Sequence, residues 1–95
     1  MYIFNVRGYL NFSEAEYILE ATVLANSKKE CCYMILEHPH HKDIFSLTQK
    51  TYKFPKSEIL QVRNKVHKLV SNSTMLKIDS SEDNLTPQFF SYRIH

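Results

Sequence analysis

The strongest local signal in this chain is a Phe-Ser-Glu-Ala-Glu-Tyr segment near its N-terminal end, which is typical of a helix start. Ser13 stands at the capping position with Glu16 three residues later, so each side chain can accept a hydrogen bond from a backbone N–H group of the first turn. Phe12 and Tyr17 occupy the positions whose apolar side chains pack together across a helix start. The sequence therefore predicts a helix over residues 13–26.

Three other segments of the first half have the patterns of strands. Residues 2–7 alternate in polarity, and Gly8 is expected to end that strand. Residues 31–36 form a continuous apolar run, and residues 43–54 are rich in β-branched and aromatic side chains. The polar connection at residues 38–42, which contains a proline, predicts a hairpin loop between these two runs.

The second half begins with a proline-initiated helix. Pro55 suits the first turn, and an apolar stripe at spacings of three and four continues to about Asn72. The stripe consists of Ile59, Val62, Val66, Leu69 and Val70. We then expect a strand over 74–78, an acidic loop over 80–88 and an extended aromatic segment over 89–94. That last segment is either a further strand beside 74–78 or one that orders on an edge strand of this or another chain.

This order of elements predicts an α+β fold, a two-layer sandwich with the ferredoxin-like βαββαβ order and an extra C-terminal strand or tail. With 95 residues, the chain is long enough for one hydrophobic core. We expect a single domain over residues 1–79, with the acidic loop and extended segment of residues 80–95 packed on the same domain. Such a fold serves many unrelated functions and identifies none of them.

The sequence contains no specific catalytic or cofactor motif. Cys31 and Cys32 are adjacent, so they are expected to be free thiols, and no spacing selects a histidine as their base. His38, His40 and His41 suggest a metal site, but their spacing lacks the pairs typical of zinc sites. We expect no enzyme activity, no cofactor, no bound metal and no small-molecule substrate, and a metal-responsive histidine loop is the least favoured hypothesis.

Charge is distributed unevenly along the chain. Residues 50–68 hold six basic residues against one acidic residue, whereas residues 12–49 hold three basic against six acidic. Lysines alternate with aromatic residues in the basic segment, a composition that can neutralise phosphates and stack on unpaired bases. The alternative hypothesis is therefore a single-stranded nucleic-acid-binding domain, using Lys50, Tyr52, Lys53, Phe54 and Lys56.

The predicted first helix is apolar on two faces. One face would pack on the sheet, while a second apolar stripe would remain on the outside of a two-layer domain. That stripe consists of Ala15, Leu19, Thr22 and Val23. The leading hypothesis is a small non-enzymatic protein-binding module, a regulator, inhibitor or adaptor. It would act through this face or an open sheet edge, on a protein partner or on a second copy as a homodimer.

The expected location is the reducing cytoplasm. No apolar run approaches the roughly 18 residues that span a bilayer, and the N-terminal residues lack the pattern of a secretory signal peptide. Free thiols suit a reducing compartment. We therefore expect no membrane partner.

Overall fold

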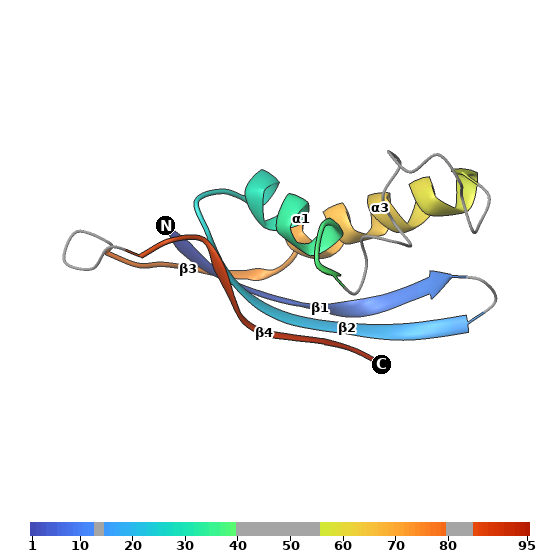
Figure 1. Cartoon of the computed structure of the whole chain (residues 1–95), viewed down its shortest axis with the longest axis horizontal. Helices are drawn as coiled ribbons and strands as arrows, with labels where there is room; N and C mark the ends of the chain where they lie inside the picture. Colours follow the sequence, from blue (N-terminus) through green and yellow to red (C-terminus); the bar gives the residue numbers. More distant parts are fainter. Residues whose placement is uncertain (13–14, 40–55, 80–84) are drawn as a thin grey trace.

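The computed structural model describes residues 1–12, 15–39, 56–79 and 85–95. They form a small α+β domain in which helices α1 and α3 cover one face of a four-stranded antiparallel sheet (Figure 1). The elements are β1 (Tyr2–Phe12), β2 (Ala15–Ala25), α1 (Lys28–Leu36), α3 (Lys56–Ser71), β3 (Thr74–Lys77) and β4 (Gln88–Ile94). The predicted loop at 38–42, strand at 43–54 and acidic loop at 80–88 lie wholly or largely outside the described residues.

The centre of the sheet is a long hairpin formed by β1 and β2. Tyr2 pairs with Ala25 and Phe12 with Ala15, without interruption between these ends. Side chains alternate between the two sides of a strand, so one face collects the even-numbered residues of β1 and the odd-numbered residues of β2. The buried side chains of that face are Phe4, Val6, Leu10, Leu19, Ala21, Val23 and Ala25. They form the floor on which the helices pack.

The predicted helix over 13–26 is wrong, because residues 15–25 form strand β2. The apolar residues of this segment fit both the 3.6-residue repeat of a helix and the two-residue repeat of a strand. Only a strand places every second residue from Tyr17 to Ala25 on one apolar face. Pairing with β1 along the whole segment stabilises the strand more than the local capping signal stabilises a helix. The second apolar stripe inferred above belongs to the helix that does not form.

Helix α1 replaces the strand predicted over 31–36. Its N-cap is Ser27, whose side chain accepts a hydrogen bond from the Glu30 N–H at 3.1 Å. The Glu30 carboxylate in turn accepts from the Asn26 N–H at 2.8 Å. This is a capping arrangement with the Ser-x-x-Glu spacing. The apolar run then forms a helical stripe, in which Cys31, Cys32, Ile35 and Leu36 are buried.

Helix α3 confirms the predicted second helix. Its buried side chains are Ile59, Val62, Val66 and Val70, and Leu69 is partly buried on the core. The helix packs on β1 and on α1, while α1 packs on β2. The Lys28 amine donates to the Ser71 carbonyl at 3.3 Å, at the C-terminal end of α3 where a positive charge is favourable.

Gly8 does not end the first strand, contrary to expectation, but lies in the middle of β1 opposite Leu19. A Cβ atom at this position would lie 2.1 Å from Cδ2 of Leu69. The absence of a side chain at Gly8 therefore allows α3 to approach the sheet closely.

The strand predicted over 74–78 is confirmed as β3, and the extended segment expected over 89–94 forms strand β4. The sheet order is β3-β1-β2-β4, so β4 lies beside β2 and not beside β3. Every pairing is antiparallel, and Phe90 is the extra residue where the β2–β4 register shifts. The ferredoxin-like order is therefore wrong, because β1 and β2 join in a hairpin with no helix between them.

The face of the sheet opposite the helices is polar at its centre. Arg7 and Glu20 form a salt bridge of 3.2 Å, and Thr22 donates to the Asn5 side-chain oxygen at 3.1 Å. Both pairs lie directly opposite each other in the β1–β2 register. Among the described residues no helix covers this face, as is common for antiparallel sheets with one solvated side (Figure 1).

Candidate strand-binding groove

The outer edge of β1 is covered by β3 along only part of its length within the described ranges. β3 pairs with β1 from Tyr2 to Asn5, whereas β1 continues to Phe12. The Ile78 N–H donates to the Met1 carbonyl at 3.0 Å. Because bonded and non-bonded pairs alternate along an antiparallel ladder, the odd-numbered residues of β1 direct their N–H and C=O groups to this edge.

Three residues of β1 therefore present backbone groups beyond the end of β3: Arg7, Tyr9 and Asn11. The pairing of β2 with β4 supports this assignment of the odd-numbered residues of β1 to the outer edge. Ile18 of β2 and His95 exchange backbone hydrogen bonds of 2.6 and 3.1 Å. Even-numbered residues of β2 thus bond to β4, and odd-numbered ones bond to the even-numbered residues of β1. No strand in the described part of the chain pairs with this stretch, which is a template for another strand.

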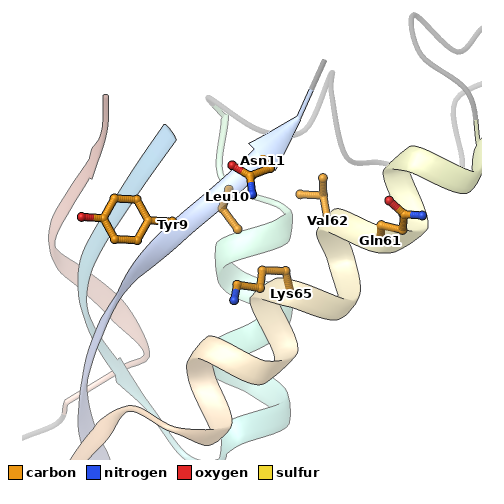
Figure 2. A pocket seen from close by; sticks show the side chains of 6 residues that line it. All are labelled: Tyr9, Leu10, Asn11, Gln61, Val62 and Lys65. Atoms are coloured by element: carbon orange, nitrogen blue, oxygen red, sulfur yellow. The ribbon is translucent and has the colours of Figure 1, made fainter. Parts of the chain in front are cut away.

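Helix α3 runs beside the stretch of β1 that no described strand covers and forms a groove with it. Figure 2 shows the six lining residues, which are Tyr9, Leu10, Asn11, Gln61, Val62 and Lys65. The cavity has a volume of about 200 Å³. Leu10 and Val62 are buried and supply its apolar floor, whereas Gln61 and Lys65 are exposed on α3. The groove thus joins backbone groups that no described strand pairs with, an apolar floor and polar side chains.

The charge of this groove is positive. Lys65 is the one charged side chain among the six lining residues, and it extends from α3 toward β1 (Figure 2). α3 carries four basic residues and one acidic residue. At 100° per residue, Glu58, Gln61, Lys65 and Lys68 share one stripe of the helix beside β1, with Glu58 in the first turn and the two lysines nearer the C-terminal end. An anionic group is therefore the favourable partner for the part of this stripe around Lys65 and Lys68.

β4, the outer strand on the β2 side of the sheet, is anchored by aromatic stacking to His38, which follows α1. The rings of His38 and Tyr92 are stacked at 3.7 Å between centroids, and Phe89 meets His38 edge-on at 4.9 Å. Phe89, Tyr92 and Ile94 also pack against the core. These contacts hold β4 on the helix layer, whereas the edge of β1 adjoins a groove, so the β1 edge is the stronger candidate site.

The predicted interface residues lie on β2 and do not share a surface. Leu19 and Val23 are each 0% exposed in the core, which leaves neither available for contact with another protein. Ala15 and Thr22 are half-buried. The open sheet edge is the part of the protein-binding hypothesis that this geometry leaves available.

The predicted nucleic-acid residues lie mainly outside the described residues, namely Lys50, Tyr52, Lys53 and Phe54. Lys56 is the first residue of α3 and is exposed. Of the histidine loop, His38 is described, whereas His40 and His41 lie outside the described residues. Among the residues that are described, no group of three or more His, Cys, Asp or Glu side chains is placed to hold a metal ion.

The two cysteines are free and buried in α1. Burial, and to a lesser extent the neighbouring Cys32, raises the pKa of Cys31 from 9.0 to about 12. Burial also raises the pKa of Cys32. Since the thiolate is the nucleophilic form, these thiols are unsuited to nucleophilic catalysis at neutral pH.

Sequence reasoning missed the groove because it depends on where β3 stops along β1, which is a long-range property. The available signal was indirect: Gln61 and Lys65 stand beside the apolar stripe of α3, and Tyr9 follows the glycine at which the strand was expected to end.

No protein-family model, curated protein or solved structure matches this chain. Within the described ranges, none of the helices has the length and apolar character needed to cross a membrane.

Proposed function

We propose that this chain is a non-enzymatic protein-binding module that takes up an extended segment of a partner protein as an added strand beside β1. The observation that supports this proposal is the combination of three residues with outward backbone groups and the adjoining groove of α3. Strand addition to an exposed sheet edge is a general mode of peptide recognition, in which backbone bonds give affinity and alternate side chains give specificity.

The added strand would pair with β1 in line with β3, beyond the point at which the pairing of β3 ends. Arg7, Tyr9 and Asn11 each offer one N–H and one C=O, so the strand could form up to six backbone hydrogen bonds. Each bond contributes a net stabilisation of about 0.5–1.5 kcal/mol. Every second side chain of the partner would face Leu10 and Val62. The contact is short, so we expect reversible binding of a peptide segment.

A proline at Tyr9 tests this mode of binding. Tyr9→Pro removes an N–H that points away from β2, and edge strands tolerate proline when that N–H faces outward. Tyr9→Ala is the matched control, because it removes the 56% exposed ring and keeps the N–H. Peptides are first selected on the wild-type protein from a displayed library of random ten-residue sequences. We expect Tyr9→Pro to lose binding at least tenfold and Tyr9→Ala to change it less than threefold.

Backbone NMR gives the second readout. Peptide binding should shift the amide signals of Arg7, Tyr9 and Asn11, and the spectrum of free Tyr9→Pro should retain the dispersion of the folded protein. Equal binding by the proline variant, or shifts confined to another part of the molecule, would contradict the proposal.

A second candidate function is single-stranded nucleic-acid binding, favoured by the charge of the helix layer. α1 and α3 together carry six basic residues and two acidic ones. Binding of this kind weakens steeply with salt, because phosphate contacts release counterions. Fluorescence anisotropy with a labelled oligo-dT at increasing salt is the test, and an affinity that does not change with salt would count against it.

A further inference from the structure

We infer that the groove beside β1 selects extended segments with acidic residues at alternate positions, and that Lys65 is the residue that determines this specificity. The inference rests on the proposed function and names the chemistry of its partner.

The charges around the groove support an acidic partner. Lys65 is the one charged residue among the described residues that line it. On β1, Arg7 is 74% exposed but already paired with Glu20 across the sheet. The acidic residue of α3, Glu58, belongs to the first turn, about 10 Å from Lys65 along the helix at 1.5 Å per residue. A carboxylate that enters the groove from a partner would therefore meet a positive charge first.

The spacing of the basic residues fits a strand. Side chains on one face of a strand repeat about every 6.6–6.8 Å. Lys65 and Lys68 are separated by about 4.5 Å along α3, a difference that flexible lysine side chains can bridge. Two acidic residues at positions i and i+2 of the added strand can thus each meet one lysine.

Peptides in which Gln replaces Glu separate the effect of charge on binding from the effect of strand addition, because the two side chains have nearly the same shape. The probes are two labelled ten-residue peptides with blocked ends, alternating Thr and Val, one with Glu at two alternate positions and the other with Gln there. We expect the acidic peptide to bind wild-type protein about tenfold more tightly at low salt, and this advantage to shrink with added salt because exposed ion pairs are screened.

Reversing the charge of Lys65 tests whether this residue determines the preference for acidic segments. Lys65→Glu should remove the preference for the acidic peptide and weaken its binding at least tenfold. Lys56→Glu is the matched control, since residue 56 lies half a turn around α3 from residue 65 and carries the same exposed charge. We expect less than a twofold effect there. Equal losses in both variants would show a general charge effect and overturn the inference.

The outcomes also distinguish this inference from the proposed function. If both peptides bind equally and shift the amides of β1, the acidic specificity is wrong while strand addition stands. If neither peptide shifts these amides, both fail. If oligo-dT displaces the acidic peptide at lower concentration, the basic face of α3 binds nucleic acid. If light scattering shows a dimer that the peptide dissociates, a second copy of this chain occupies the edge. Either of these last two results overturns the inference.

Discussion

Replacing Gly8 by Ala tests the closest approach between the helix layer and the sheet. Gly8 lies within β1, and an added Cβ would lie 2.1 Å from Cδ2, 2.9 Å from Cδ1 and 3.0 Å from Cγ of Leu69. These distances are shorter than van der Waals contact, so the Leu69 side chain or the whole of α3 must move. The variant therefore introduces overpacking at one defined contact.

The expected effect combines two opposing contributions. Overpacking a filled interior costs about 1–3 kcal/mol of unfolding free energy. Removing a glycine from a strand interior recovers about 0.5–1 kcal/mol, because alanine has fewer conformations to lose on folding. Leu69 is only partly buried and ends in a flexible side chain, so we take the middle of the first range, about 2 kcal/mol, and not its upper end. We expect Gly8→Ala to lower the free energy of unfolding by about 1 kcal/mol.

Urea denaturation followed by circular dichroism measures this change. With an m value of about 1–1.5 kcal/mol/M, the midpoint should fall by roughly 0.7–1 M. The same glycine replacement in a Leu69→Ala background should cost less, because the truncated side chain leaves room for the new methyl group. A Gly8→Ala protein as stable as wild type, or an equal cost in both backgrounds, would refute the close-approach argument.

Two further predictions concern the core. Val23→Asp should prevent folding, since it buries a carboxylate at a 0% exposed position, whereas Thr22→Asp, on the opposite face of β2, should leave a folded protein; NMR dispersion distinguishes the two. Because the pKa of Cys31 rises on folding, from 9.0 to about 12, its stabilising contribution is complete below pH 9. Between pH 9 and about pH 12 this contribution falls by about 1.4 kcal/mol per pH unit. The unfolding free energy is measured in urea at pH 8 and at pH 10.5. Its decrease between these two pH values should be larger in wild type than in Cys31→Ala.

The elements that the sequence predicted correctly are those whose patterns favour a single structure. α3 has an apolar stripe that fits a helix alone, and its four buried residues all belong to that stripe. β4 follows from a run rich in aromatic residues, and β3 from a short extended run that begins at the β-branched Thr74. Their neighbours in the sheet could not be predicted, because pairing depends on segments that are distant in the sequence.

Two of the three errors in the first half, the helix predicted over 13–26 and the strand predicted over 31–36, have one physical origin. The Ser-x-x-Glu capping pattern occurs twice, once at Ser13 and once at Ser27, and only the second of these segments is helical downstream. The helix predicted after Ser13 was apolar on nearly all sides, which is unfavourable for a two-layer domain. As a strand, the same residues pair with β1 throughout and place Leu19, Ala21, Val23 and Ala25 together on the core.

The candidate groove was the least predictable feature. Exposed residues such as Gln61 and Lys65 do not recur at a spacing that would indicate a binding site. Their position matters only because β3 ends its pairing opposite Asn5 and leaves the remaining edge of β1 beside α3.

The arrangement of β4 has a consequence for the order of folding. The β1–β2 hairpin joins residues that are close in sequence, whereas the pairing of Leu19 with Ile94 closes a loop of most of the chain. Closing such a long loop carries a larger entropic cost and is slower than forming a hairpin. We expect β4 to join the sheet after the hairpin has formed, so that β2 is itself an unprotected edge until the C-terminal segment docks, during the period when a newly made chain is most prone to aggregate.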